Sequence, residues 1–166
     1  SAQDPPELFQ FNQSTQQAAY FIVEVTINGN QIDPEDWVGA FNGDICVGAE
    51  QWDTSQCGGG VCELIIMGND GNDYSEGYCS SGDIPTFKIY DASEDTYIDA
   101  YPSENNSWFN NGFNMINSLS NEMPSTPGCM DEDACNYNAD ATEDDDSCTY
   151  AEGTCDCDDN PVDDYC

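Results

Sequence analysis

The chain has 166 residues with 34 Asp and Glu, one basic residue (Lys88) and no His, so its formal net charge at pH 7 is −33. Such a surface repels nucleic-acid phosphates and anionic membranes, because proteins bind both through Lys and Arg. Only carboxylate and thiol chemistry remains for catalysis, and carboxylate pairs at glycosidase spacing arise by chance among so many acids, so we predict no enzyme.

The cysteines indicate the compartment. Ten cysteines, an even number with close spacing, are typical of disulfides in secreted proteins. No apolar run approaches the roughly 20 residues of a membrane span. We therefore expect an extracellular or cell-surface protein that does not insert into a membrane.

Composition changes near residues 124–128, a Pro/Ser/Thr/Gly cluster typical of a linker. Before residue 129 the chain contains 20 acids and four cysteines, and from there to the end it contains 14 acids and six cysteines. We expect an extended leader (1–7), a β-domain (8–123), a linker (124–128) and a Cys/Asp-rich module (129–166).

The first part reads as short strands. In 20–27 the alternation places Phe21, Val23, Val25 and Ile27 on one face, and Asn42-Gly43 predicts a hairpin turn. No ten-residue stretch has helical periodicity, so we predict a mainly β fold, an antiparallel β-sandwich of Ig-like or jelly-roll topology. The remaining expected strands are 36–41, 44–52, 61–67, 85–90, 96–101 and 108–116.

Residues 8–12 have two interpretations. Phe9 and Phe11 lie on one side of an extended segment, which suits the first strand of the chain's own sandwich. The alternative is a strand donated to a neighbouring subunit, with Leu8, Phe9 and Phe11 as the assembly contacts.

The four cysteines of the first part allow three connectivities. Cys57 and Cys62 enclose three glycines, which relieve backbone strain in a small ring. We prefer this pair, which leaves Cys46 to bond with Cys79.

The C-terminal module is dense in oxygen ligands and contains no counter-charge. Calcium takes six to eight oxygens from carboxylates, amides and carbonyls, whereas the alternative is a solvated, disordered acidic tail. The cysteine density favours the ordered, calcium-bound form. The expected Ca²⁺ ligands are Asp131, Asp133, Asn136, Asn138, Asp140, Glu143, Asp144, Asp145, Asp146, Asp156 and Asp158. The expected disulfide cysteines are Cys129, Cys135, Cys148, Cys155, Cys157 and Cys166.

Residues 128–150 resemble a repeat of secreted bacterial proteins, Gly-Cys-x-Asp-x-x-Ala-Cys-Asn-Tyr-Asn-x-x-Ala-x-x-Asp-Asp-x-Ser-Cys-x-Tyr, which is similar to thrombospondin type 3 calcium repeats. The chain departs from the repeat at Asp146, where the family usually has Gly. The resemblance covers about a quarter of the chain and implies calcium and an extracellular location, without a reaction.

Residues 36–49, 51–54 and 82–91 are similar to a module of secreted, often multidomain proteins. This resemblance implies an extracellular β-domain and no assigned catalytic residues. Donor-strand pilus subunits are a looser likeness at the level of the fold, which is a weak basis for function.

Other motifs have a functional and a structural interpretation. Trp37, Trp52 and Trp108 are either a sugar-stacking face or sandwich packing, and Trp37 and Trp52 are positioned to pair across the hairpin. The acidic turn 69–73 is either a calcium loop or a solvated loop. Asn12 and Asn105 begin glycosylation sequons.

Together these features predict a structural protein, the protomer of a homopolymeric surface fibre that is assembled by strand donation and stabilised by disulfides and calcium. The alternative is a carbohydrate-binding or adhesion module whose partner is a polysaccharide.

Overall fold

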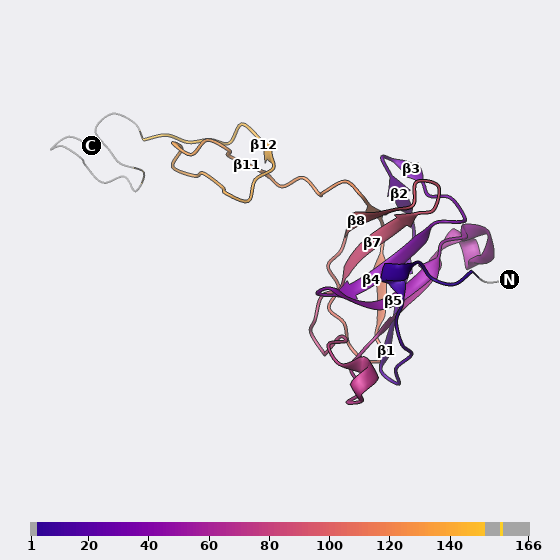
Figure 1. Cartoon of the computed structure of the whole chain (residues 1–166). Coiled ribbons are helices and arrows are strands. Elements are labelled where there is room, and N and C mark those ends of the chain that lie inside the picture. Colours follow the sequence, from indigo (N-terminus) through magenta and orange to yellow (C-terminus); the bar gives the residue numbers. More distant parts are fainter. Residues whose placement is uncertain (1–2, 152–156, 158–166) are drawn as a thin grey trace. The chain divides into compact units, whose positions relative to one another are not determined.

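The computed structural model describes residues 3–151 and residue 157, and divides the chain into two units, Ser1–Met123 and Pro124–Cys166 (Figure 1). The two units are described separately. Among the described residues every helix is a three-residue 3-10 turn, and none has the length and apolar character needed to cross a membrane.

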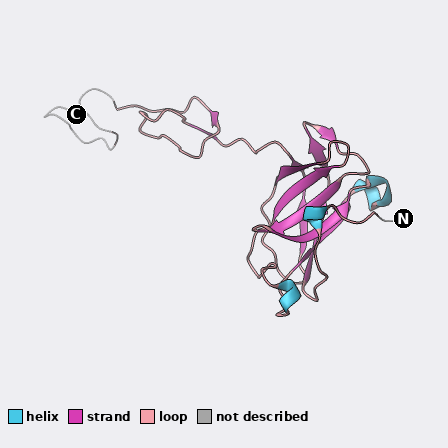
Figure 2. Ribbon diagram, viewed as in Figure 1, coloured by secondary structure: helices cyan, strands magenta, loops and turns pink. Residues whose placement is uncertain are grey.

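The first unit consists of two sheets (Figure 2). One has seven strands in the order β3-β2-β10-β8-β7-β4-β5, and the other has three in the order β6-β1-β9. The strands are β1 (Gln17–Ile22), β2 (Val25–Ile27), β3 (Asn30–Gln31), β4 (Trp37–Asn42), β5 (Ile45–Gln51), β6 (Cys62–Met67), β7 (Thr86–Asp91), β8 (Thr96–Pro102), β9 (Phe113–Ile116) and β10 (Leu119–Ser120). The 3-10 turns are η1 (Glu7–Phe9), η2 (Thr54–Gln56), η3 (Gly58–Gly60) and η4 (Asp73–Ser75).

A shared hydrophobic core joins the two sheets. Tyr20 of β1 and Leu64 of β6 pack with Val38 of β4 and Ile89 of β7 in one buried cluster. Most neighbouring strands are antiparallel, and the pairs β1–β9 and β2–β10 are parallel. The predicted mainly β sandwich is therefore confirmed, with two parallel pairs that the sequence did not suggest.

The expected strand over 20–27 is two strands, because the chain crosses from one sheet to the other between β1 and β2. In β1 the buried alternate residues are Ala18, Tyr20 and Ile22. The neighbouring Phe21 is half-buried, and Val23, in the crossing, is 45% exposed. The prediction that Phe21 and Val23 share a face with Val25 is wrong because the crossing interrupts the alternation.

The hairpin around Asn42 and Gly43 is confirmed. Gly43 has φ +61°, which a turn of this kind requires, and β4 pairs with β5 antiparallel with a register shift between Ala40 and Phe41. Trp37 lies opposite Gln51. Trp52 packs in the core between the sheets and Trp37 in a separate outer cluster, so the predicted pairing of the two tryptophans is wrong.

The expected strand over 108–116 is also shorter than predicted, because only Phe113–Ile116 is a strand. Trp108 instead lies in the preceding loop with its side chain buried in the core. Its indole N–H donates to the carbonyl of Ile66 at 3.0 Å. A Cβ on Gly68 would lie 2.1 Å from the indole ring, so the glycine makes room for this side chain.

Residues 8–12 contain no strand. Glu7–Phe9 is the turn η1, closed by the Phe9 N–H donating to the carbonyl of Pro6 at 2.8 Å. Figure 1 shows η1 over β4 and β5. The interpretation of this segment as the first strand of its own sandwich is therefore wrong, because the local turn lets Phe9 bury its ring against the outer face of the seven-stranded sheet.

The second unit contains one small ladder, in which β11 (Pro127–Gly128) pairs in parallel with β12 (Glu143–Asp144). Few of its described side chains are buried, chiefly Cys129 and Ala134. Two disulfides, Cys129–Cys148 and Cys135–Cys157, cross-link it. So small a unit cannot build a sizeable core, and cross-links constrain its chain instead.

Candidate functional site

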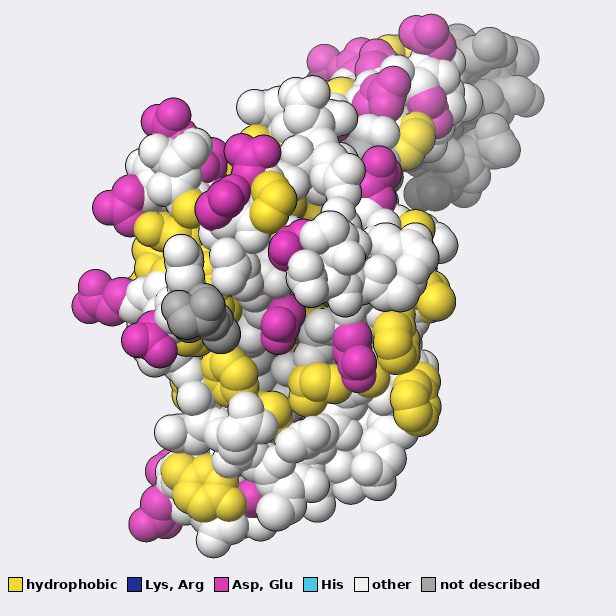
Figure 3. Space-filling view, turned by 90° about the vertical axis from the view of Figure 1, so that its right-hand side faces the viewer, with side chains coloured by type: hydrophobic (Ala, Val, Ile, Leu, Met, Phe, Trp, Pro, Cys, Tyr) yellow, Lys and Arg dark blue, Asp and Glu magenta, His cyan; other side chains and the backbone are white. Residues whose placement is uncertain are grey.

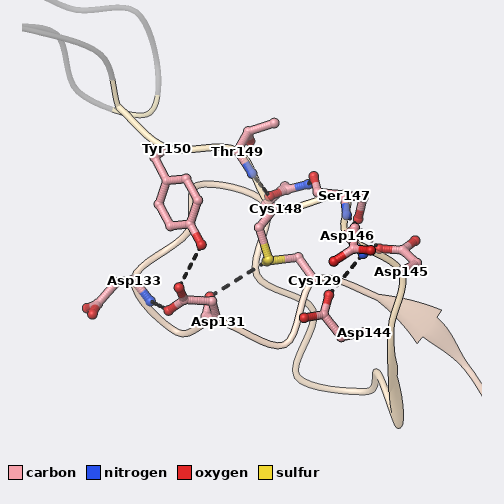
Figure 4. Close-up of a disulfide and its surroundings, with 11 residues drawn as sticks. Cys129, Asp131, Asp133, Asp144, Asp145, Asp146, Ser147, Cys148, Thr149 and Tyr150 are labelled. Carbon is pink, nitrogen blue, oxygen red and sulfur yellow. Dashed lines mark hydrogen bonds between the residues drawn. A yellow bond between two sulfur atoms is a disulfide. The ribbon is translucent and has the colours of Figure 1, made fainter.

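The acidic side chains of the C-terminal module organise its backbone. Asp131 accepts a hydrogen bond from the backbone N–H of Asp133, and Asp144 accepts one from Asp146, both at 3.0 Å (Figure 4). Asn138 and Asp145 do the same for the residue two positions further on. Each of these side chains holds a local turn of the kind that Asp and Asn favour.

Three further hydrogen bonds join the first part of the module to residues 147–150. The Tyr150 hydroxyl donates to Asp131 at 2.7 Å, which lowers the pKa of the Asp131 carboxyl and raises the pKa of Tyr150 (Figure 4). Asn136 accepts from the N–H of Thr149 at 2.8 Å and donates to the carbonyl of Ser147 at 2.7 Å. Asp146 has φ +58°, a conformation that glycine adopts more readily, at the position where the repeat it resembles has Gly.

Most of the predicted calcium ligands in the described part of this module are exposed. Within the described residues, no three acidic or cysteine side chains converge on one point. Their donor atoms are all oxygens, the chemistry that calcium prefers, so the donor set fits this ion although its members are not gathered around a point. Asp156, Asp158, Cys155 and Cys166 lie outside the described residues.

The strand β9 is the last strand of the three-stranded sheet, with β1 as its neighbour on one side. On the other side the loop 103–109 bonds to both ends of the strand: the Gly112 N–H donates to the Phe109 carbonyl and the Asn117 N–H to the Glu104 carboxylate, both at 2.9 Å. The carbonyls of Gly112 and Ile116 accept from the N–H groups of Ala19 and Val23, both at 2.9 Å. Because successive residues of a strand direct their N–H and C=O groups to opposite sides, those of Phe113 point away from β1, as do those of Met115. The side chain of Asn106 covers the Met115 carbonyl at 2.9 Å.

The outer surface of this sheet is apolar. Phe113 is 81% exposed and Met115 52% exposed, and the Phe113 ring stacks on Phe21 with centroids 6.3 Å apart. The strands β1, β6 and β9 together contain one carboxylate, Glu63. We define the β9 face as this edge with the outward side chains Ala19, Phe21, Val23, Ile65, Phe113 and Met115.

A pocket of about 740 Å³ lies beside Phe21, between β5 and β6. Its lining combines apolar groups with carboxylates and amides. Desolvation raises the pKa of Glu50, and the charge of Glu63 adds to the shift. The lining residues are Phe21, Glu50, Gln51, Asp53, Gln56, Cys57, Gly58, Val61, Cys62, Glu63 and Ile65.

Phe9 occupies a separate site on the outer face of the seven-stranded sheet. Its ring is fully buried and makes edge contacts with Phe41 and Tyr97, with centroids 5.8 and 5.4 Å apart. Leu8 is 53% exposed, and Phe11 is half-buried beside the same cluster. We define the Phe9 site as the residues around this ring, Trp37, Gly39, Phe41, Cys46, Ala49, Tyr90 and Tyr97.

One of the two disulfides predicted for the first unit is confirmed. Cys57 and Cys62 are bonded, whereas Cys46 and Cys79 are free thiols. Cys46 packs in the Phe9 site and Cys79 in the core between the sheets, so the predicted bond between them is wrong. Burial raises the pKa of Cys46 to about 11 and of Cys79 to about 12.

The three tryptophans are packing residues. Trp37 is 7% exposed, and Trp52 and Trp108 are each 2% exposed. The sugar-stacking interpretation of these residues is therefore wrong, because none presents a ring face to solvent.

The two sequon asparagines, Asn12 and Asn105, are both exposed. Asp70, in the acidic turn 69–73, accepts hydrogen bonds from Thr15, Tyr74 and Ser75. Asp70 therefore joins this loop to the residues that precede β1.

The sequence reasoning overlooked the β9 face and the role of Gly39. The alternation of Phe113 and Met115 in 113–116 was the available signal for an exposed apolar row.

The negative charge of the chain is spread over its surface. Figure 3 shows Asp and Glu side chains scattered over the face that it displays, with hydrophobic side chains between them.

Comparison of the chain with models of protein families, with curated proteins and with solved structures finds no match in any of the three.

Proposed function

We propose that the protein is an extracellular structural subunit that associates with further copies of itself. The observation that carries this proposal is the β9 face, where the last strand of a sheet presents the exposed side chains Phe113 and Met115. Soluble proteins usually cover, shorten or charge such an edge because it pairs readily with other chains. Here the loop 103–109 covers the ends of a short edge strand, but the strand still carries exposed apolar side chains.

Charge favours a second copy as the occupant. Every copy carries a net charge of −33, so two copies repel each other wherever carboxylates face carboxylates. At physiological ionic strength this repulsion is screened beyond about 8 Å, so the local charge at the contact decides. Glu63 is the single carboxylate of the three strands, and the Glu104 carboxylate beside the end of β9 is held by Asn117. The β9 face therefore carries few charges, and like-charged copies can approach there.

The geometry of β9 suits pairing about a twofold axis. In an antiparallel pair centred on Phe113, this residue lies opposite the same residue of the second copy, and the two exchange both N–H···O=C bonds. The exposed Phe113 side chain then packs against its counterpart, and Met115 lies diagonally beside the Phe113 of the second copy. The same patch serves both copies, as a twofold contact requires.

The other features fit a structural role outside the cell. Three disulfides constrain the chain in the described residues, and disulfides persist in oxidising compartments. The C-terminal module would bind Ca²⁺ through carboxylates such as Asp131 and Asp144. Bound cations would reduce the self-repulsion of an acidic subunit.

Sedimentation and electron microscopy of the purified chain test the proposal. We expect concentration-dependent association in millimolar calcium, and weaker association of the double variant Phe113→Ser/Met115→Ser. Ile84→Ser is the matched control, because Ile84 is 51% exposed but lies outside the β9 face. A monomer at all concentrations, or equal association of all three proteins, contradicts the proposal.

Polysaccharide binding is a second candidate function, favoured by the pocket beside Phe21. An aromatic ring next to carboxylates and amides is a combination that stacks on and hydrogen-bonds to hydroxylated ligands. The negative charge directs this candidate to neutral glycans. Binding on a glycan array that is lost in Phe21→Ala and Glu63→Gln would support it, and an array without signal would exclude the glycans tested.

A further inference from the structure

A twofold contact through β9 joins two copies and then stops, because each copy has used its only β9 face. A fibre needs a second, head-to-tail contact. We infer that the segment 7–11, called the N-terminal segment below, is exchanged between copies, so that Phe9 of one copy occupies the Phe9 site of the next. This inference rests on the self-association proposed above.

The Phe9 site is shaped for this ring. A Cβ atom on residue 39 would lie 2.7 Å from the Phe9 ring, so glycine is what leaves room for it. Tyr90 and Tyr97 face the ring from the neighbouring strands, with centroids 6.5 and 5.4 Å away. Phe9 is fully buried while the adjacent Leu8 is exposed, so one side chain provides most of the contact.

The backbone of the N-terminal segment is held much more weakly than the Phe9 side chain. Within the described chain, residues 7–12 belong to no strand. The Leu8 N–H donates to the Tyr97 hydroxyl at 3.2 Å, and the Asn12 N–H donates to the Tyr78 hydroxyl at 2.8 Å. The segment can therefore leave its site without the rupture of a β ladder.

Firm attachment to the domain begins at Ser14. This buried side chain donates to the carbonyl of Gly68 at 2.6 Å, and Asp70 accepts from the N–H of Thr15 at 3.1 Å. The residues 12–13 between the segment and Ser14 have no regular structure. They are the hinge, and exchange alters the conformation of these residues alone.

Exchange conserves the contacts of Phe9. An emptied site would expose Trp37 and Phe41 to water, which is unfavourable, so the segment stays in its own chain until another copy supplies a replacement. The same ring fills the same site whether the segment binds its own chain or the next one. The two arrangements therefore differ mainly in the conformation of the hinge and in the free-energy cost of association. Segments swap between identical subunits under this condition. The exchanged element is a turn with extended flanks and not the strand expected from the sequence.

The native thiol of Cys46 supplies a direct test. Phe11 and Cys46 line the same pocket, and Phe11→Cys places a second thiol there. Mild oxidation of associated protein then joins segment and site covalently. Exchange predicts a ladder of covalent multimers on a non-reducing gel, whereas a segment that stays in its own chain gives a cross-linked monomer. Phe11→Ser, and Phe11→Cys combined with Cys46→Ser, are the controls and should give no ladder.

A mixing experiment tests the same inference without oxidation. Phe9→Ala removes the inserted ring but keeps the site, and Gly39→Val blocks the site but keeps the ring. Both variants also carry Phe113→Ser/Met115→Ser, so that the β9 contact forms no heterodimers. Neither variant alone should associate through exchange, an equimolar mixture should form heterodimers, and a mixture that stays monomeric contradicts the exchange.

The outcomes separate the two proposals. Association of the native protein with only intramolecular cross-linking overturns the exchange and leaves the β9 contact standing. A ladder in Phe113→Ser/Met115→Ser supports the exchange, and association of this variant equal to that of the native protein rejects the β9 contact.

Discussion

The ring of Phe9 packs directly against the backbone of Gly39. A Cβ atom on residue 39 would lie 2.7 Å from this ring. This contact joins two segments far apart in sequence. It explains why a short, polar N-terminal region contains one fully buried aromatic side chain, and why β4 has a glycine at residue 39.

Gly39→Ala should therefore displace Phe9. Overpacking of this kind costs about 1–3 kcal/mol of unfolding free energy, which urea denaturation measures. The Cys46 thiol, now buried beside Phe9, should react with a maleimide at a rate closer to that of denatured protein. Gly58→Ala is the control, because no atom lies within 4 Å of the Cβ position there. Equal thiol reactivity in both variants would show that Phe9 does not cover Cys46.

The disulfide Cys57–Cys62 should stabilise the sandwich measurably although its ring is small. It closes the loop that precedes β6, whose first residue, Cys62, is buried. For a loop of this length the loss of unfolded-state entropy corresponds to about 2 kcal/mol. Cys57→Ala/Cys62→Ala should lower the midpoint of urea unfolding accordingly. An unchanged midpoint would show that the glycine-rich loop needs no cross-link.

The acid sensitivity of the first unit should depend on Asp70. Hydrogen bonds to this carboxylate, first of all from Tyr74, hold its pKa well below the usual 3.8. A depressed carboxyl pKa stabilises the folded state at pH values above 3.8, and this contribution fades as pH falls below that value. In Asp70→Asn the thermal midpoint should be lower at neutral pH and should fall less steeply on acidification.

Asp44→Asn provides the comparison for Asp70→Asn. Asp44 is exposed in the β4–β5 turn, and its carboxylate accepts no hydrogen bond from the described residues. Its replacement removes a carboxylate but no hydrogen bond, so the thermal midpoint at neutral pH should stay that of the native protein. If both variants follow the native curve, the hydrogen bonds of Asp70 contribute nothing to the pH dependence.

Local signals in the sequence were sufficient for part of the fold. Asn42 and Gly43 form a turn that their own backbone preferences specify, so the hairpin was predictable. The bond between Cys57 and Cys62 was predictable for the same reason, since three of the four residues between them are glycines. Neither feature depends on residues elsewhere in the chain.

The failures have non-local causes. The crossing between β1 and β2 leaves an unbroken alternation in the sequence, so nothing local marks Phe21 as outward-facing. The register shift after Ala40 places Cys46 opposite Phe41, on the outer face and away from Cys79. Burial of Phe9 depends on Gly39 in a strand that follows it in the chain. Each of these outcomes is decided by tertiary packing, which periodicity does not report.

Calcium binding to the C-terminal module can be separated from its turn structure by one substitution. Asp144 accepts a hydrogen bond from the N–H of Asp146 through one oxygen, and Asp144→Asn retains an oxygen that can accept this bond while it removes the charge. We expect the native module to bind Ca²⁺ in the range of about 10⁻⁴–10⁻³ M that is typical of extracellular modules, and the variant to bind more weakly. Isothermal titration calorimetry measures the difference.

Proteolysis gives an independent measure of calcium binding in the same module. Glu132 and Glu143 are exposed, so a glutamate-specific protease has sites on both sides of Asn136 and Asn138. Calcium that draws the surrounding carboxylates together should slow cleavage at both sites, and EDTA should restore it. Magnesium at equal concentration is the control, because it prefers a smaller, octahedral site. Equal cleavage rates with calcium and with EDTA would mean that the hydrogen-bonded turns and the disulfide Cys129–Cys148 hold the module without an ion.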